Sequence, residues 1–145
     1  MEIKNVPLAD YVDVPKKDRK KYQTDHIPFH EKIAYFPDGY RKNSTDVVSP
    51  RALKHIQELE LILQNENDAP NPNPNPNSPK TRAILCFMVQ RPDVTVFQPS
   101  NIDLTYKAAV KQAVANGVEV YAIQMEWNTQ GECYFGKLLE VRLDG

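Results

Sequence analysis

The first residues of the chain place a carboxylate and an ammonium two positions apart. In the opening stretch MEIKNV, apolar and polar residues alternate, which is the pattern of a β-strand. Successive side chains of a strand point to opposite faces, so Glu2 and Lys4 are expected on one face. The Glu2 carboxylate and the Ile3 carbonyl could hold Mg²⁺, while Lys4 orients a water or balances charge on a phosphorane. This pattern suits metal-assisted phosphodiester hydrolysis, and the alternative is an exposed ion pair.

A second group of polar residues falls in the first turns of a predicted helix. Ser49 is a favoured N-cap, and the proline after it loses no needed donor at the first helical position. Arg51, Lys54 and His55 follow, where free amides and the helix dipole favour phosphate. The alternative is a solvated polar helix face, and His55 by itself is more typical of a surface histidine than of a general base.

Two further positions have both a functional and a structural interpretation. Arg91 follows an apolar strand, and α/β sheets open their ligand crevices at the carboxyl ends of parallel strands. Arg91 is therefore a candidate phosphate contact, and the alternative is an ion pair with Asp93. Asp38, in the stretch FPD, could approach the metal or cap a turn, and the turn is favoured.

A basic run lies in the polar, proline-broken segment of residues 7–34, which is expected to be a surface insertion. Its five cationic residues are Lys16, Lys17, Arg19, Lys20 and Lys21. A flexible basic arm would add non-specific, salt-dependent affinity for a phosphate backbone, and Tyr22 beside it could stack on an unpaired base. The alternative is solvated surface. His26 and His30 lack the ligand spacing of a zinc site.

The remaining patterns predict a single α/β domain over residues 1–145. An amphipathic helix should extend to about residue 64 and pack on a sheet, and an Asn/Pro-rich, low-complexity insertion should follow over residues 65–80. An apolar strand (83–90), a helix begun by Asp103 and a strand (118–127) then form a strand-helix-strand unit. Residues 134–143 would add an edge strand. The expected architecture is a mixed sheet flanked by helices.

Composition limits the partners that charge alone can suggest. The 145 residues include 18 basic and 19 acidic side chains, so the net charge of −1 favours neither nucleic acid nor membranes globally. Cys86 and Cys133 lack metal-binding spacing and are expected to be free thiols. No signal pattern is present, and no apolar run approaches the roughly 20 residues of a membrane helix. A soluble intracellular protein that does not bind membranes is expected.

Six stretches occur in the order found in the sugar fermentation stimulation protein A family. They are MEIKNV, YFPD, SPRALKHI, FMVQRPDV, FQPSNIDLTY and GVEVYA. The resemblance covers the chain outside residues 9–34 and 65–80. It implies a C-terminal domain similar to the PD-(D/E)xK nucleases, preceded in the family by an OB-like domain associated with nucleic acid binding. Glu2 and Lys4 match the family's E-V-K strand, whereas Ala52 replaces a glycine of its R-G-x-K-H-L pattern.

The resemblance also implies what this stretch of chain lacks. The OB-like domain, the first core strands and the strand whose Asp completes the metal site have no counterpart here, so the expectation is an N-terminally truncated domain. Mg²⁺ would then bind weakly through Glu2. Three functions follow: non-specific DNA binding by the complete form, with a regulatory role in sugar metabolism implied by the family name; a metal-dependent nuclease, inactive as this fragment; or an inactive remnant.

Overall fold

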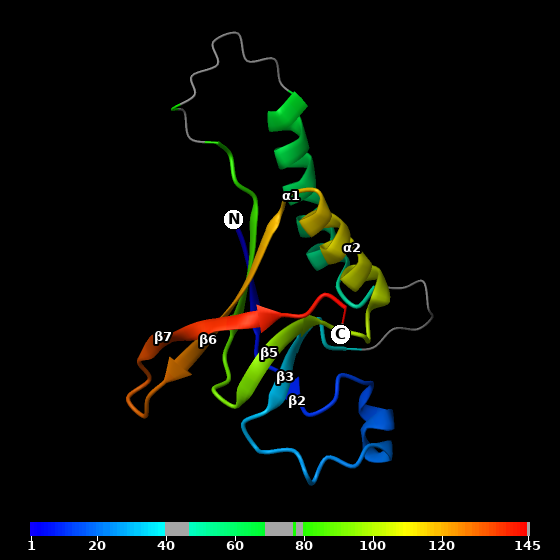
Figure 1. The fold of residues 1–145 in the computed structure, drawn as a ribbon, viewed down its shortest axis with the longest axis vertical. Helices are drawn as coiled ribbons and strands as arrows, with labels where there is room; N and C mark the ends of the chain where they lie inside the picture. Colours follow the sequence, from blue (N-terminus) through cyan, green and yellow to red (C-terminus); the bar gives the residue numbers. More distant parts are fainter. Residues whose placement is uncertain (40–46, 69–76, 78–79, 145) are drawn as a thin grey trace.

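The computed structural model describes residues 1–39, 47–68, 77 and 80–144. Within them the chain forms one mixed sheet with two α-helices, which confirms the α/β prediction (Figure 1). In chain order the elements are β1 (Glu2–Val6), β2 (Ala9–Asp10), the 3-10 helix η1 (Lys16–Lys21), β3 (Lys32–Phe36), α1 (Pro50–Asp68), β4 (Ile84–Val89), β5 (Val94–Pro99), α2 (Leu104–Ala115), β6 (Glu119–Trp127) and β7 (Cys133–Val141).

The sheet has the strand order β1-β4-β6-β7-β5-β3-β2. Strands β1, β4 and β6 run parallel, as do β3, β5 and β7, and the antiparallel β6–β7 pair joins the two groups. The predicted unit of two parallel strands connected through a helix is present as β4, α2 and β6, with β5 inside the same connection. Residues 134–143 were wrongly predicted to form an edge strand, because β7 pairs with β6 on one side and β5 on the other.

Both helices begin with the predicted side-chain caps. Ser49 Oγ accepts a hydrogen bond from the amide of Ala52 at 3.2 Å, and Asp103 Oδ1 accepts one from the amide of Tyr106 at 2.9 Å. Beyond α2, Gly117 has a φ of +99°, a conformation that favours glycine. None of the helices in the described ranges is long and apolar enough to cross a membrane.

The core lies between the helices and one face of the sheet. Alternate residues of β4 point into it, and aromatic rings from β3, β4, β5 and α2 meet there, with 4.2 Å between the stacked ring centroids of Phe87 and Phe97. Buried side chains that line this core include Val6, Ala52, Ile56, Leu85, Phe87, Val89, Phe97, Tyr106 and Val110. The strands of this region therefore turn one set of side chains toward the helices.

Both predicted insertions overlap regular elements. Residues 7–34 include β2 and the beginning of β3, which pair with each other, so this segment joins the sheet. Helix α1 runs to Asp68 and so includes residues 65–68, while 69–76, 78 and 79 lie outside the described residues. Whether the two segments are insertions relative to related proteins stays a prediction.

Candidate functional site

Strand β1 presents Glu2 and Lys4 on the face of the sheet that α1 covers. In the parallel register with β4, Glu2 lies opposite Leu85 and Lys4 opposite Phe87, both of which are fully buried. Ile3, between them, is 56% exposed, as expected of a side chain on the opposite face. Both charged side chains of β1 are therefore directed toward the helical layer.

His55, on α1, completes a cluster with these two residues, here named the Glu2–Lys4–His55 cluster. Lys4 Nζ lies 3.1 Å from Glu2 Oε1 and 2.7 Å from His55 Nδ1, and His55 Nδ1 lies 2.9 Å from the same carboxylate oxygen. The side chains of Lys4, His55 and Glu2 are 11%, 20% and 32% exposed. The ammonium is thus the most enclosed of the three groups, and the carboxylate faces solvent most.

The charges of the cluster stabilise one another. Partial burial tends to raise the pKa of Glu2, but the hydrogen bond and charge of Lys4, together with His55, outweigh it and hold the pKa below its usual value. An ammonium can only donate hydrogen bonds, so Lys4 is the expected donor to both neighbours. An ammonium has three N–H donors, which leaves one for a further acceptor.

The described residues do not by themselves fit a divalent cation. Mg²⁺ takes oxygen ligands, commonly one or two carboxylates with waters and substrate phosphates. Glu2 supplies the only carboxylate of the cluster, and Lys4 occupies one of its oxygens. Across the described ranges, no three His, Cys, Asp or Glu side chains are arranged to hold a metal. Asp38 is exposed after β3 and is not part of the cluster.

Arg51 and Lys54, predicted to bind phosphate from α1, differ in their placement. Arg51 precedes His55 by four residues, so the two lie on the same side of the helix. Its side chain is exposed. Lys54 is 73% exposed, and its Nζ lies 3.8 Å from a carboxylate oxygen of Glu58. Arg51 is therefore the better placed of the two to act together with the Glu2–Lys4–His55 cluster.

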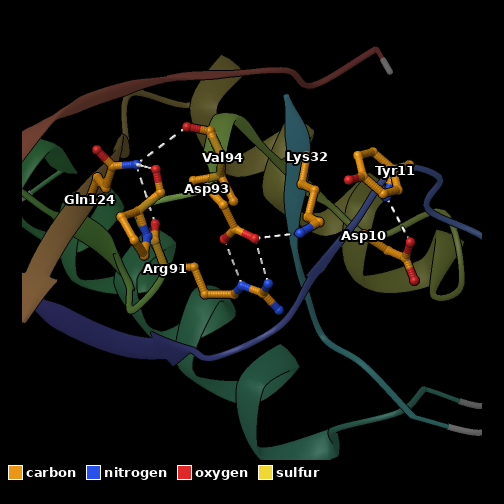
Figure 2. Close-up of polar contacts among 8 residues, drawn as sticks. Asp10, Tyr11, Lys32, Arg91, Asp93, Val94 and Gln124 are labelled. Carbon is orange, nitrogen blue, oxygen red and sulfur yellow. Dashed lines mark hydrogen bonds and ion pairs between the residues drawn. The ribbon is translucent and has the colours of Figure 1, made fainter. Parts of the chain in front are cut away.

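Arg91 forms the ion pair that was the alternative interpretation of its position (Figure 2). Its Nε and Nη2 donate to the two carboxylate oxygens of Asp93 at 2.8 and 2.6 Å, and Lys32 Nζ donates to Asp93 Oδ2 at 2.5 Å. The hydrogen bonds from Arg91, and then Lys32, lower the pKa of Asp93 to about 2 despite burial. Gln124 Nε2 donates to main-chain carbonyls of the same loop. Two donors of Arg91 are therefore already occupied.

The basic run forms η1, and part of its charge is used within the fold. Arg19 Nη2 donates to the Tyr35 hydroxyl at 2.6 Å, and Nη1 lies 3.2 Å from Asp10 Oδ2. Lys21 pairs with Asp18 at 2.5 Å. The exposed side chains of the run and the residue after it include Lys16, Lys17, Lys20 and Tyr22. Lys16, Lys17 and Lys20 are exposed and, unlike Arg19 and Lys21, form no ion pair within the described residues.

The contact between His55 and Lys4 is the part of the site that sequence reasoning missed. The two residues are 51 positions apart, and nothing local to either one indicates the other. A weak indication existed in the helix pattern: His55 adjoins Ile56 and lies one turn before Leu59, both buried. A polar side chain at that border is in reach of the neighbouring strand.

Comparisons with known proteins agree with one another. Residues 77–131 match the model of the sugar fermentation stimulation protein RE domain. Sugar fermentation stimulation protein homologs from Synechocystis and Hahella chejuensis are 32% and 33% identical over 107 and 108 residues, which are 73% and 74% of this chain. Each match covers 35% of the relative, so the chain spans about a third of the length of these curated relatives.

A similar fold occurs in a solved structure described as Pyrococcus furiosus SfsA in complex with Ca²⁺. The TM-score is 0.61 at 21% sequence identity. The superposition covers 97% of this chain and 43% of the Pyrococcus chain. At this identity the likeness concerns the fold: a mixed sheet flanked by helices.

Proposed function

The chain belongs to the sugar fermentation stimulation protein family, and on that premise we propose that it binds DNA through the phosphate backbone with little sequence preference. The observation that carries the proposal is the Glu2–Lys4–His55 cluster, which holds an ammonium at two points and leaves it one donor. Arg51, exposed on the same side of α1 as His55, adds a guanidinium suited to phosphate.

The exposed lysines of η1 support the same function at a second place. Lys16, Lys17 and Lys20 can neutralise phosphates and release counterions, which gives affinity without sequence preference. A regulatory role in sugar metabolism, which the family name suggests, would then act through DNA.

Phosphodiester hydrolysis is the second candidate. The Pyrococcus relative was solved with Ca²⁺, and Glu2 is the carboxylate of the cluster that could help to hold a divalent cation. Because the cluster supplies one carboxylate, at least one further acidic ligand would have to come from elsewhere. When bound, such a cation would polarise the phosphate and lower the pKa of a bound water. The role of Lys4 would be to donate to the phosphate.

The test is a comparison of Lys4→Met with wild type, by fluorescence anisotropy of labelled duplexes of unrelated sequence at low salt. Loss of one charge-assisted hydrogen bond should weaken binding about tenfold, equally for every sequence. Lys111→Met is the matched control, because Lys111 pairs with Asp144 at the surface of α2. Thermal melts establish that both variants fold. Equal affinity of Lys4→Met and wild type would exclude Lys4 as a contact.

The same samples separate binding from hydrolysis. Binding alone should be indifferent to a chelator, whereas cleavage should require Mg²⁺ or Mn²⁺ and disappear in Lys4→Met. If wild-type protein neither binds nor cleaves DNA at low salt, the chain is an inactive remnant.

A further inference from the structure

We propose that His55 is a positioning residue, which accepts a hydrogen bond from Lys4 at Nδ1 and so directs the third N–H of Lys4 at an anionic oxygen. The identity of that oxygen as a phosphate oxygen rests on the proposed function. The contact between the two side chains does not, since it follows from the 2.7 Å separation of Lys4 Nζ and His55 Nδ1.

The distances within the cluster favour one tautomer of His55. An ammonium can only donate, so a hydrogen on Nδ1 would set donor against donor across 2.7 Å. With the ring hydrogen on Nε2, Nδ1 accepts from Lys4, and Glu2 Oε1 accepts from Lys4 at 3.1 Å, so the 2.9 Å contact between Nδ1 and Oε1 joins two acceptors of one ammonium. With the hydrogen on Nδ1 the ring would donate to Oε1 instead, and the shorter contact with Lys4 favours the first arrangement. Two of the three N–H groups of Lys4 are then fixed, which also fixes the direction of the third.

The fold holds His55 more firmly than Glu2, so His55 is the better anchor for the Lys4 ammonium. A lysine has a flexible four-carbon stem, and Glu2, one residue into β1, is a third exposed. His55 is held by α1, whose neighbouring residues Ala52 and Ile56 are 2% and 0% exposed. Removal of the imidazole would leave Lys4 with Glu2 as its remaining anchor, so its ammonium would sample several directions.

A double-mutant cycle tests whether His55 acts through Lys4. DNA affinity is measured for wild type, Lys4→Met, His55→Ala, His55→Asn and the Lys4→Met/His55→Ala double variant. We expect His55→Ala to weaken binding about fivefold. His55→Asn should restore most of that affinity, since its amide oxygen lies close to the place of Nδ1. The double variant should bind no worse than Lys4→Met alone. Additive losses, or a failure of asparagine to restore binding, would overturn the proposal.

A nuclear magnetic resonance measurement on the whole chain tests the contact without DNA. Nitrogen-15 shifts of the three histidines are recorded at about pH 8, where unperturbed imidazoles are neutral, and His55→Asn identifies the His55 signals. We expect hydrogen on Nε2, an acceptor shift for Nδ1, and a change in the Nδ1 shift in Lys4→Met. Hydrogen on Nδ1 in wild type would overturn the proposal. A wild type that bound no DNA would instead overturn the proposed function, while the Nδ1 signal would still decide the contact.

Discussion

Tyr106 and Tyr35 are buried tyrosines whose hydroxyl groups have opposite surroundings. Tyr106 is 0% exposed, and its hydroxyl has no hydrogen-bond partner among the described residues. Burial, and then the charges of Asp103 and Glu2, raise its pKa. Tyr35 is 2% exposed, but its hydroxyl accepts a hydrogen bond from Arg19 at 2.6 Å. Burial of the hydroxyl therefore costs more free energy of folding at Tyr106 than at Tyr35. Only the Tyr35 hydroxyl has a hydrogen bond within the protein that replaces its hydrogen bonds to water.

Phenylalanine substitutions measure that difference. Tyr106→Phe removes an unpaired buried hydroxyl and should raise the free energy of unfolding by about 1 kcal/mol. Tyr35→Phe removes the acceptor of Arg19 Nη2, although Arg19 keeps its ion pair with Asp10, and should lower the free energy of unfolding by about 1 kcal/mol. Urea denaturation at neutral pH gives both values. A loss of stability in Tyr106→Phe would mean that this hydroxyl has a partner, such as a bound water.

Asp93 should make the free energy of unfolding depend on pH in the acidic range. Its pKa in the folded state is about 2, below the usual 3.8, chiefly because Arg91 and Lys32 donate to it. Its contribution is therefore complete well above pH 3.8 and is lost as pH falls toward 2. Asp93→Asn should lower the free energy of unfolding at neutral pH by about 2 kcal/mol, since two cations lose their counterion.

Urea denaturation at several pH values checks this prediction. The difference in free energy of unfolding between wild type and Asp93→Asn should become smaller as pH falls toward 2. Asp144→Asn is the control, because the Asp144 carboxylate is 86% exposed and its removal should have no measurable effect. A gap of constant size at every pH would contradict the lowered pKa.

At the scale of elements, the sequence predicts the helices and strands that can be recognised from their own residues. Helix α2 lies between a capping Asp103 and Gly117, and β4 is an apolar run whose Leu85, Phe87 and Val89 point into the core. Strand β5 was not predicted. Pro92 precedes it and Pro99 ends it, and it forms a strand because it pairs with β3, which is far away in the chain. The Lys4–His55 contact was missed for the same reason.

Besides the β2–β3 pairing and the contact of Arg19 with Tyr35, the arm formed by residues 7–31 is attached to the sheet through Asp13. This carboxylate is 5% exposed and accepts hydrogen bonds from Gln98 Nε2, Ser100 Oγ and the amide of Asn101 at 2.6, 2.7 and 2.7 Å. Three donors at the end of β5 thus converge on one side chain of the arm. The attachment was not visible in the sequence, in which the segment is polar and broken by prolines.

Asp13→Ala should loosen the arm while the sheet stays folded. Charge-assisted hydrogen bonds contribute about 1.5 to 3 kcal/mol each, so amide hydrogen exchange over residues 15–31 should accelerate at least about tenfold. Exchange in β4 should not change. Asp18→Asn serves as the control, since Asp18 pairs with Lys21 at the surface of the arm. Exchange in the arm that equalled wild type would mean that other contacts hold it.

At the scale of the whole molecule, nucleic acid affinity has to come from local clusters of charge, because the net charge is −1. The cluster on β1 and α1 and the exposed lysines of η1 are the two candidates. Figure 1 shows η1 beyond β2 and β3, away from the two packed helices. A bound nucleic acid would therefore need to extend along the molecule to contact both places, which makes their contributions separable by mutation.

The salt dependence of binding measures the contribution of the arm. Each phosphate neutralised on duplex DNA adds about 0.9 to the slope of log affinity against log salt. Lys16→Gln/Lys17→Gln/Lys20→Gln should therefore reduce the slope by about 2 to 3 if all three lysines contact phosphates. Lys80→Gln/Lys111→Gln/Lys137→Gln removes the same charge from other surfaces and should leave the slope near that of wild type, since long-range attraction is screened beyond roughly 10 Å. Equal slopes for the two triple variants would place DNA away from the arm and leave Lys4 and Arg51 as the contacts.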